Sequence, residues 1–351
     1  MDKKSIKSIV TFDELVDKFP RIKQKSKNLA EKLLPLYPSP ELAQIVAALM
    51  TDGHIDWYTS DGRPRTRKII LYSSNKDECD WFIKTCKDLF GLEGKTIPYK
   101  PKYGQYKLQP YKAVINSAVI ARILILAGVP AGDKTKIGYI VPEWVISGDN
   151  KIKKSFLMTL FTFDGCKPYK RRTTWTIEYS TVTSQKTLNR TLLFFKQLKQ
   201  LLKEFQIYMN HIPTEHLRNN KKIMVISSIS SRESIVNFYR FLGYDNPEKQ
   251  KRLEEAVKYI SDIVRLENKD TSKILEKFKN IHGTDKKTIY FINKTLNTNY
   301  TYRQFEHFRR CEIEVPLKLF VLASKNIDMK PKLLEWMDFL VKKFNVPSSQ
   351  K

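Results

Sequence analysis

Two aspartates occupy matching positions in the chain, each at the end of an apolar segment and each followed by glycine. Asp52 precedes Gly53, and Asp164 precedes Gly165. If the apolar segments are helices, each carboxylate lies at the negative end of a helix dipole, where a negative charge is unfavourable. Two such helices packed side by side would bring the carboxylates together, and they would repel unless a cation lay between them. Oxygen ligands without His or Cys nearby indicate a hard cation, which predicts Mg²⁺.

A pair of lysines repeats in the same way. Lys134 stands six residues after Gly128, and Lys249 stands six residues after Gly243. Near a scissile phosphate, a lysine can stabilise developing charge or help to activate water. A single Asp-Gly at a helix end is an ordinary helix stop, and most lysines in so basic a chain are simply solvated. The duplication is what favours a catalytic role for all four residues.

The segments around these residues predict an internal duplication of one structural unit. Apolar spacing and turn residues predict, for the first copy, helices at 39–50, 75–90 and 117–127 and strands at 54–58, 65–73, 95–99 and 106–115. The same signals predict, for the second copy, helices at 150–163, 184–204 and 232–242 and strands at 173–182, 205–211 and 221–228. The predicted fold class is α+β, with two tandem αββαββα repeats. The predicted domains are a basic N-terminal extension (1–38), repeat 1 (39–145), repeat 2 (146–255) and a helical basic C-terminal domain (256–351).

The charge of the chain indicates a polyanionic partner. Its 351 residues carry 63 Lys plus Arg against 37 Asp plus Glu, a net charge of +26. A surplus of this size creates a long-range positive field that attracts nucleic acid. Hydrophobic residues make up 41% of the chain, which is enough for real cores and excludes a disordered protein.

No two of the four cysteines form a Cys-x-x-Cys pair. The sequence also has no apolar segment long enough to span a bilayer. Free thiols suit a reducing compartment, so we expect a cytoplasmic or organellar-matrix protein with no membrane partner. The N-terminal segment lacks the apolar core of a signal peptide.

The two motifs resemble those of the LAGLIDADG family of homing endonucleases. The motifs are IVAALMTDG at 45–53 and LMTLFTFDG at 157–165, and the flanks GVP at 128–130, VPEW at 141–144 and FLGY at 241–244 are also similar to the family. The resemblance covers roughly residues 39–255. It implies a single chain with pseudo-twofold symmetry, acting as a monomer in intron homing. It departs from the family at Phe163, where a small residue is usual, so the second helix is expected to pack less tightly.

The resemblance implies roles by position. Asp52 and Asp164 match the metal-binding acids, and Lys134 and Lys249 match the basic residues of the two half-sites. Gln185 is offered as the polar residue near the scissile phosphate at the end of the second strand. The reaction implied is Mg²⁺-dependent hydrolysis of both strands of a long asymmetric DNA duplex.

The family also implies that each repeat presents an antiparallel sheet to the major groove, where long polar side chains read base edges. Strand alternation then predicts which side chains face the DNA. These are Arg63, Arg65, Arg67, Lys107, Gln109 and Tyr111 in repeat 1, and Lys167, Arg171, Arg172, Thr174, Thr176, Glu178, Ser180, Lys221 and Lys222 in repeat 2. A solvated, charged edge strand would give the same pattern.

The C-terminal hundred residues predict helices at 284–296 and 301–310 joined by an Asn-Thr-Asn turn. This is similar to a helix-turn-helix, whose second helix would place Arg303 and Gln304 in a major groove and leave Arg309 exposed. A plain helical hairpin has the same pattern.

Two other functions fit the same fold. The first is an RNA-binding maturase whose partner is intron RNA, and the second is a DNA-binding regulator without catalysis. Retention of both acids and both lysines favours the nuclease over either. An intein is not expected, because the sequence lacks a splicing Cys or Ser at its start and a His-Asn at its end.

Overall fold

The computed structural model describes residues 7–20, 22–60, 63–65, 68–100, 109–171, 174–216, 222–264, 268–310, 312–313 and 315–327. The chain forms two compact units, Met1–Leu253 and Glu254–Lys351. None of the helices in the described ranges combines the length and the apolar character needed to cross a lipid bilayer. The predicted boundary between the two repeats stays a prediction.

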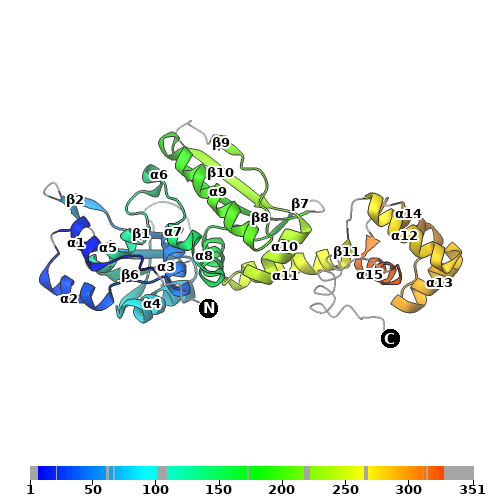
Figure 1. Cartoon of the computed structure of the whole chain (residues 1–351), viewed down its shortest axis with the longest axis horizontal. Helices are drawn as coiled ribbons and strands as arrows, with labels where there is room; N and C mark the ends of the chain where they lie inside the picture. The colour runs from blue at the N-terminus through cyan, green and yellow to red at the C-terminus, as the bar shows by residue number, and fades with distance from the viewer. Residues whose placement is uncertain are drawn as a thin grey trace. The chain divides into compact units, whose positions relative to one another are not determined.

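The first unit contains both copies of the predicted repeat (Figure 1). Its helices are α1 (Phe12–Lys18), α2 (Gln24–Leu33), α3 (Pro40–Met50), α4 (Lys76–Phe90), α5 (Ala118–Leu126), α6 (Lys134–Ile137), α7 (Glu143–Ile146), α8 (Asn150–Phe163), the 3₁₀ turn η1 (Gln185–Thr187), α9 (Leu188–Glu204), α10 (Arg232–Asn237), the π-helical η2 (Phe238–Leu242) and the start of α11 (Pro247–Asp262). Its strands are β1 (Gly53–Ile55), β2 (Tyr58–Ser60), β3 (Arg63–Arg65), β4 (Lys68–Ser73), β5 (Gly94–Pro98), β6 (Tyr111–Asn116), β7 (Tyr169–Arg171), β8 (Thr174–Thr183), β9 (Thr214–His216) and β10 (Ile223–Ile229).

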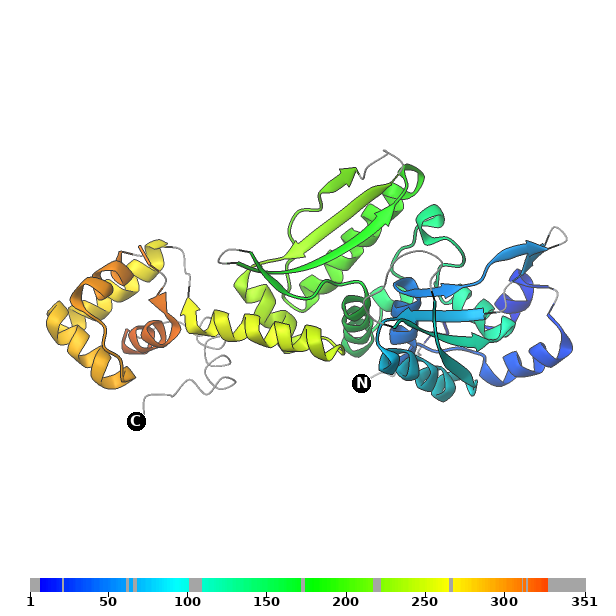
Figure 2. The same cartoon turned by 180° about the vertical axis from the view of Figure 1, so that it is seen from behind.

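Each repeat folds into a four-stranded antiparallel sheet with the same order of strands. The order is β1-β4-β6-β5 in the first repeat and β7-β8-β10-β9 in the second. Helix α4 packs on β4, β5 and β6, and α9 packs on β10, as Figures 1 and 2 show. In β4, Ile69 and Leu71 are fully buried, whereas Lys68 at one end of the strand is exposed and Tyr72 near the other end is half-buried. The predicted α+β class and the duplicated order of helices and strands are confirmed.

The strand expected at 205–211 was wrong. Phe205, Ile207 and Met209 are buried in alternation, which gives the sequence the period of a strand. However, Gln206 has a φ of 58°, a conformation that extended backbone does not adopt. The segment therefore runs as an irregular connection, and the edge strand forms later, at β9.

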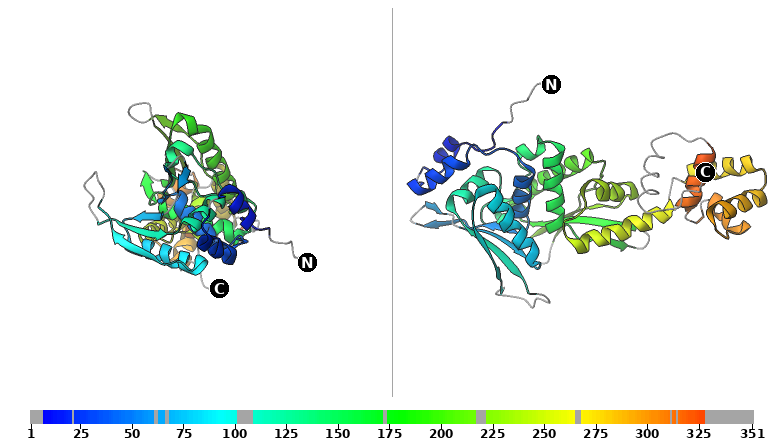
Figure 3. Two further views of the ribbon diagram at one scale, coloured as in Figure 1. Left: turned by 90° about the vertical axis from the view of Figure 1, so that its left-hand side faces the viewer. Right: turned by 90° about the horizontal axis from the view of Figure 1, so that it is seen from below.

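Helices α3 and α8 pack against each other at the centre of the first unit (Figure 3). Ser39 caps α3 by accepting a hydrogen bond from the Leu42 N–H at 3.1 Å, and Asp149 caps α8 by accepting from Lys151 and Ile152. Both helices are buried on several sides, because sheets and helices of both repeats surround them. Residues Ala47 and Ala48 of α3 and Thr159 and Thr162 of α8 are buried, as small side chains at a close helix contact should be.

Phe163 lies at the end of α8, where a small residue was expected. Its ring packs on that of Trp81 in α4, with centroids 6.2 Å apart. The bulky side chain thus crosses to the other repeat and adds contact between the repeats.

The N-terminal segment contains two helices, α1 and α2, that pack on α5 of the first repeat. Leu15 and Ala30 are fully buried in this contact region.

The second unit is mainly helical. It contains the rest of α11 together with α12 (Asn268–His282), α13 (Asp285–Leu296), α14 (Tyr302–Arg309) and α15 (Leu317–Asn326), and a two-stranded sheet of β11 (Ile263–Val264) and β12 (Val315–Pro316). Helix α13 ends at Asn297, which has a left-handed conformation, and Thr301 caps α14. The predicted pair of helices with a short turn is present.

Candidate active site

Asp52 and Asp164 lie at the C-terminal ends of α3 and α8, as the sequence predicts. Asp164 is the C-cap residue of α8, and its N–H donates to the Leu160 carbonyl at 3.1 Å. Asp52 follows the C-cap residue of α3, Thr51, whose hydroxyl lies 3.0 Å from the carbonyls of Ala47 and Ala48. The next residue in each repeat is a glycine, where a Cβ atom would lie 2.4 Å from Leu49 Cα in one case and 2.5 Å from the Phe161 carbonyl oxygen in the other. Glycine is therefore required by the sharp turn from each helix into its sheet.

The two predicted lysines bind the ends of these same helices. Lys134 Nζ donates to the carbonyls of Met50 (3.2 Å) and Thr51, the last residues before Asp52. A positive charge at the C-terminal end of a helix is favourable, because it satisfies carbonyls that have no partner in the helix. The sequence predicted both lysines but not this contact.

Lys249 makes the matching contact with α8. Its Nζ lies 2.6 Å from the Thr162 carbonyl oxygen, 2.5 Å from that of Gly165, 3.3 Å from that of Phe163 and 3.5 Å from that of Phe161. The four residues thus form two similar halves, each with an acid next to a lysine-bound helix end.

The charges of the four residues act on one another. Burial, and then the neighbouring charge of Asp52, raises the pKa of Asp164 to about 7. Burial lowers the pKa of Lys134 to about 8 against the opposing effect of Asp164 and Asp52. Loss of hydration also raises the pKa of Asp52 and lowers that of Lys249. The influence of Asp52 on the pKa of Asp164 agrees with the predicted proximity of the two carboxylates.

A tyrosine distinguishes the two halves. In the strand that follows each motif, Gly53 pairs with Leu71 and Gly165 pairs with Tyr179, so these two residues are equivalent. The Tyr179 hydroxyl donates to Asp164 Oδ2 at 3.3 Å, whereas leucine has no group that could donate to Asp52. Tyr179 alternates with polar residues, like any core residue of a strand, so no local signal in the sequence marks this role.

A third carboxylate lies among these charges and was also missed. Glu78, in the first turn of α4, raises the pKa of Asp52 and opposes the lowering of the pKa of Lys249. Its side chain accepts hydrogen bonds from Ser73 (2.5 Å) and from Asn246 of the second repeat (2.8 Å). The sequence held no signal for it beyond an acidic residue in the first turn of a helix.

Gln185 lies in η1, beyond the end of β8, and its side chain is exposed. Pairing of Gly165 with Tyr179 makes Thr181 the equivalent of Ser73, the last residue of β4. Thr181 lies 3.5 Å from the Tyr139 hydroxyl, and Tyr139 is also influenced by the charge of Asp164. By register, Thr181 is thus the polar residue of β8 that corresponds to Ser73, and the role of Gln185 stays a prediction.

The donor set suits a hard divalent cation. Asp52 and Asp164 offer carboxylate oxygens, and Mg²⁺ commonly takes one or two carboxylates and completes its shell with water and phosphate oxygens. Within the described residues, no three His, Cys, Asp or Glu side chains form a metal-binding group. Three of the cysteines, Cys79, Cys86 and Cys166, are free thiols, as expected.

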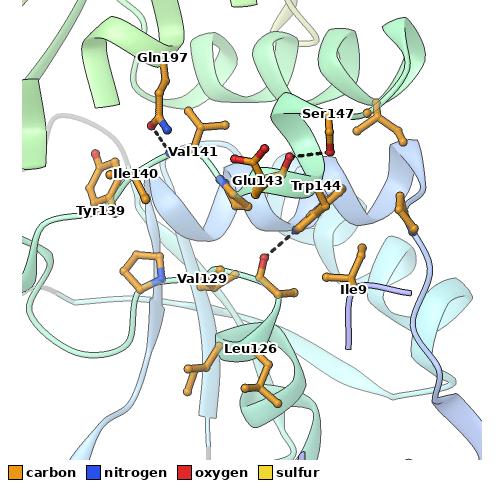
Figure 4. Close-up of a pocket in the computed structure, with 18 of the residues that line it drawn as sticks. Ile9, Leu126, Val129, Tyr139, Ile140, Val141, Glu143, Trp144, Ser147 and Gln197 are labelled. Carbon is orange, nitrogen blue, oxygen red and sulfur yellow. Dashed lines mark hydrogen bonds between the residues drawn. The ribbon is translucent and has the colours of Figure 1, made fainter. Parts of the chain in front are cut away.

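The connection between the repeats is fixed to both of them (Figure 4). The Val141 N–H donates to Gln197 of α9 at 3.0 Å, and Trp144 Nε1 donates to the Ala127 carbonyl, after α5, at 2.8 Å. These residues line a cavity of about 1000 Å³, and none of the four site residues lines it. The anchored connection carries Lys134 into the site.

No family model matches the chain. Among curated proteins it is 28% identical over 235 residues to the replication factor C small subunit of Methanocaldococcus jannaschii, covering 62% of this chain and 12% of that protein. It is 25% identical over 298 residues to the tRNA-splicing ligase RtcB of Pyrococcus furiosus, covering 80% of this chain and 30% of that protein. The chain therefore spans less than a third of the length of these relatives.

The solved structures that the chain is similar to include homing endonucleases. I-DmoI in complex with its target DNA is 11% identical, with a TM-score of 0.40, covering 58% of this chain and 93% of that one. I-WcaI bound to its DNA recognition sequence is 12% identical, with a TM-score of 0.42, covering 68% and 97%. Full-length DUF199/WhiA from Thermatoga maritima is 16% identical, with a TM-score of 0.38, covering 96% of both. The fold rests on the chain's own topology. Two αββαββα repeats pair through α3 and α8, each of which carries one of the two motifs.

The chain has two tandem αββαββα repeats, which is the arrangement that the resemblance to the LAGLIDADG family implies.

The structure describes four of the six residues predicted to face DNA in the first repeat. Arg67 and Lys107 lie outside the described residues, and Arg63 and Arg65 lie in β3, which pairs only with β2. Gln109 donates its amide to the carbonyls of Tyr99 (3.2 Å) and Pro110 (2.9 Å).

The expected orientation of Tyr111 was wrong. In β6 it is in phase with Ala113 and Ile115, which are buried, because side chains two residues apart share a face of a strand. Lys112 is the basic residue of β6 on the opposite face, and its ammonium group lies 5.4 Å from the centre of the Tyr99 ring. Adjacent apolar residues, Val114 and Ile115, concealed the phase of this strand from the sequence.

The second sheet presents Thr174 and Arg171, both exposed, with Lys222 exposed beside β10. Glu178 and Ser180 are half-buried. Lys167 is exposed and forms an ion pair with Glu248. The predicted residues Arg172 and Lys221 lie outside the described residues.

Thr176 was expected to be exposed and is instead buried, at 9%. Its cross-strand partner is Tyr169, and partners in adjacent strands share a face. The Tyr169 hydroxyl reaches Glu178 at 2.5 Å, so its ring runs over this part of the strand.

In the second unit, Arg303 and Gln304 are exposed on α14, as predicted. The Gln304 side-chain oxygen accepts from the Thr301 N–H at 2.9 Å as part of the helix cap. Arg309 was expected to be exposed but has only 17% of its side chain accessible, and it pairs with Glu276 of α12 at 2.5 Å. Arg303 is thus the stronger candidate for a contact with DNA.

Proposed function

We propose that this chain is a site-specific, magnesium-dependent endonuclease that cuts both strands of a DNA duplex, acting as a monomer. One observation carries the proposal. Asp52 and Asp164 lie at the ends of two paired helices, and a lysine binds the terminal carbonyls of each helix. Two similar centres with approximate twofold symmetry suit a substrate with two antiparallel strands.

In this proposal, the two aspartates hold the metal ion. When bound, Mg²⁺ would activate water and stabilise charge on the phosphate that is attacked. The aspartates stand where the helix dipoles oppose negative charge, and Lys134 and Lys249 offset that cost by neutralising the helix ends. Tyr179 donates to Asp164 and orients its carboxylate.

Affinity would come mainly from phosphate contacts, which suit a chain with a net charge of +26. Lys112 and Arg171 are basic residues of the two sheets that would make such contacts. Intron homing, the biological role that the family resemblance implies, is part of the same proposal.

The curated relatives support no other activity for the chain. A replication factor subunit, an RNA ligase and an RNA polymerase subunit bear names of unrelated activities, and the chain matches only 12%, 30% and 20% of their lengths. A segment shared by proteins that differ in this way is independent of what each whole protein does. We therefore propose none of those activities for this chain.

A DNA-binding regulator without catalysis is the second candidate, and one observation favours it. Lys249 Nζ lies within 3.5 Å of four carbonyl oxygens, and an ammonium group has only three N–H donors. All of its donors are therefore engaged, so a contact between Lys249 and a phosphate would require it to leave the helix end. An RNA-binding maturase stays the third candidate.

A plasmid library of random duplex segments separates these functions. The protein is incubated with the library in Mg²⁺ or in EDTA, and linear products are sequenced from their ends. The nuclease proposal predicts linear products in Mg²⁺ alone, with ends that share one sequence. Selective retention of one duplex on the protein without any cutting would support the regulator instead, and retention of transcribed RNA alone would support the maturase. Asp88→Asn, a change at an exposed aspartate on α4, is the matched control for later variants at the site.

A further inference from the structure

Glu78 connects the first repeat to the part of the second repeat that carries Lys249. Its Oε1 accepts a hydrogen bond from Asn246 Nδ2 at 2.8 Å, and its Oε2 accepts from Ser73 Oγ at 2.5 Å. Asn246 in turn accepts from the backbone N–H groups of Glu248 and Lys249, both at 3.1 Å. The carboxylate of one repeat therefore fixes the helix start from which Lys249 extends.

Thr187 makes the corresponding connection in the opposite direction. Its hydroxyl, in the second repeat, donates to the Thr135 carbonyl at 2.9 Å. Thr135 follows Lys134 in the first repeat, so the bond joins the two repeats. Asp133 fixes the other side of that turn, because its carboxylate accepts from the Thr135 N–H at 3.1 Å. The Thr183 hydroxyl lies 2.9 Å from that of Thr187 and holds it in place.

Glu78 and Thr187 occupy the same position relative to a helix cap in the two repeats. Each is the third residue after the cap of the helix that follows the second strand, the caps being Asn75 for α4 and Ser184 for η1. The third helical residue faces back toward the cap, which brings its side chain to the end of the preceding strand. The two contacts are thus related by the same approximate symmetry as the acids and the lysines.

We propose that each lysine is positioned across the repeat interface by this third helical residue, Lys249 by Glu78 through Asn246 and Lys134 by Thr187 through Thr135. The two connections differ in chemistry. Glu78 accepts charge-assisted bonds, whereas Thr187 makes a neutral one, and charge-assisted bonds are the stronger. Under the proposed function, on which this part of the inference rests, each half-site then depends on a residue of the other repeat.

Lysine acetylation tests the positioning without any need for DNA. A limiting amount of sulfo-NHS-acetate acetylates accessible lysines through their neutral amine form, and peptide mass spectrometry measures the labelling of Lys249 and Lys134 against the exposed Lys199. In Glu78→Ala we expect labelling of Lys249 to rise about tenfold, as for the loss of one hydrogen bond to a charged group, with Lys134 unchanged. In Thr187→Val we expect the reverse, with labelling of Lys134 raised by a smaller factor.

Conservative variants and a control complete the test. Glu78→Gln keeps an acceptor for Asn246 but removes the charge that opposes the lowering of the pKa of Lys249, so labelling of Lys249 should rise less than in Glu78→Ala. Thr187→Ser keeps the donor to Thr135 and should label like the wild type. Glu93→Ala removes an exposed carboxylate that pairs with Lys87 in the same repeat, and should change neither lysine. Thermal unfolding of each variant accompanies the labelling, so that a general loosening is recognised by a rise at both lysines.

The inference is overturned if either lysine fails to respond to its own partner, or if both respond equally to each variant. If the wild-type protein cuts no duplex but the crossed labelling pattern appears, the proposed function fails and the positioning stands. If it does cut, strand-labelled duplex should show that Glu78→Ala slows one strand more and Thr187→Val slows the other more.

Discussion

Lys249 Nζ lies 2.6 Å from the carbonyl oxygen of Thr162, so a lysine 87 residues further along the chain completes the end of the helix that carries Asp164. Lys134 does the same for the helix that carries Asp52, through Thr51. Each lysine thus has a structural role that does not depend on catalysis. The acids and the lysines stand together because the carbonyls that the lysines satisfy belong to the residues beside the acids.

Replacing either lysine with methionine should destabilise the first unit. Methionine keeps the apolar stem but leaves terminal helix carbonyls without a donor, which costs about 1–3 kcal/mol. Urea unfolding of Lys134→Met and Lys249→Met measures the loss, with Lys199→Met, at an exposed position, as the control. Unchanged midpoints for both variants would show that water replaces the ammonium group at no cost.

The pH dependence of stability should report Asp164. Its pKa is raised to about 7 by burial and by Asp52, so the folded protein retains a proton that the unfolded chain releases near its ordinary value of 3.8. This contribution to stability is present at low pH and is lost as pH rises through 7. Asp164→Asn removes it, so the melting temperature of the variant relative to wild type should increase between pH 5 and 7.5 in EDTA. A difference that is constant over this range would contradict the raised pKa.

The salt dependence of DNA binding should identify Lys112 as a phosphate contact. The affinity of a protein that neutralises phosphates falls with salt, and each contact adds about 0.9 to the slope of log K against log salt concentration. Lys112→Ala should therefore lower the slope by about one on the duplex recovered from the library. Lys84, exposed on α4, provides the control, because α4 packs on the sheet from the side of Ala113 and Ile115. Equal slopes for Lys112→Ala and wild type would exclude this contact.

Two arginines of α14 should behave differently. Arg303→Ala should weaken DNA binding without altering thermal stability, because the side chain is exposed. Arg309→Ala should lower the melting temperature of the second unit, because its partners Glu276 and Asp285 lose their counter-charge. Fluorescence anisotropy and calorimetry on both variants test the pair. Loss of binding in Arg309→Ala with unchanged stability would reverse the assignment.

The sequence predicted the parts of the fold that depend on local pattern. The apolar run that ends at Asp52 and the capped helix that ends at Asp164 each contain their own start and stop signals, so their bounds could be read directly. The matched spacing of Lys134 and Lys249 reflects the duplication, because each lysine returns to the end of a helix that carries one of the aspartates. These residues required no knowledge of packing.

The rest depended on contacts between distant residues. Glu78 and Tyr179 belong to the site because the other repeat and the paired strand bring partners to them, and no local signal marks such a contact. Thr176 stands at a position where strand alternation predicts an exposed side chain, but Tyr169 on the neighbouring strand covers it. Gln206 shows the opposite case, in which a left-handed residue interrupts a segment that has a strand's period.

Strand-specific cleavage by the two aspartate variants tests the central claim most directly. The duplex recovered from the library is labelled at one end of each strand in turn and incubated in Mg²⁺ with wild type, Asp52→Asn, Asp164→Asn or the Asp88→Asn control. The account predicts that each site variant loses linear product by about a hundredfold or more, the scale expected when a preorganised charged group of an active site is removed, while the control cuts like wild type. Cleavage of both strands at the wild-type rate by either site variant would contradict it.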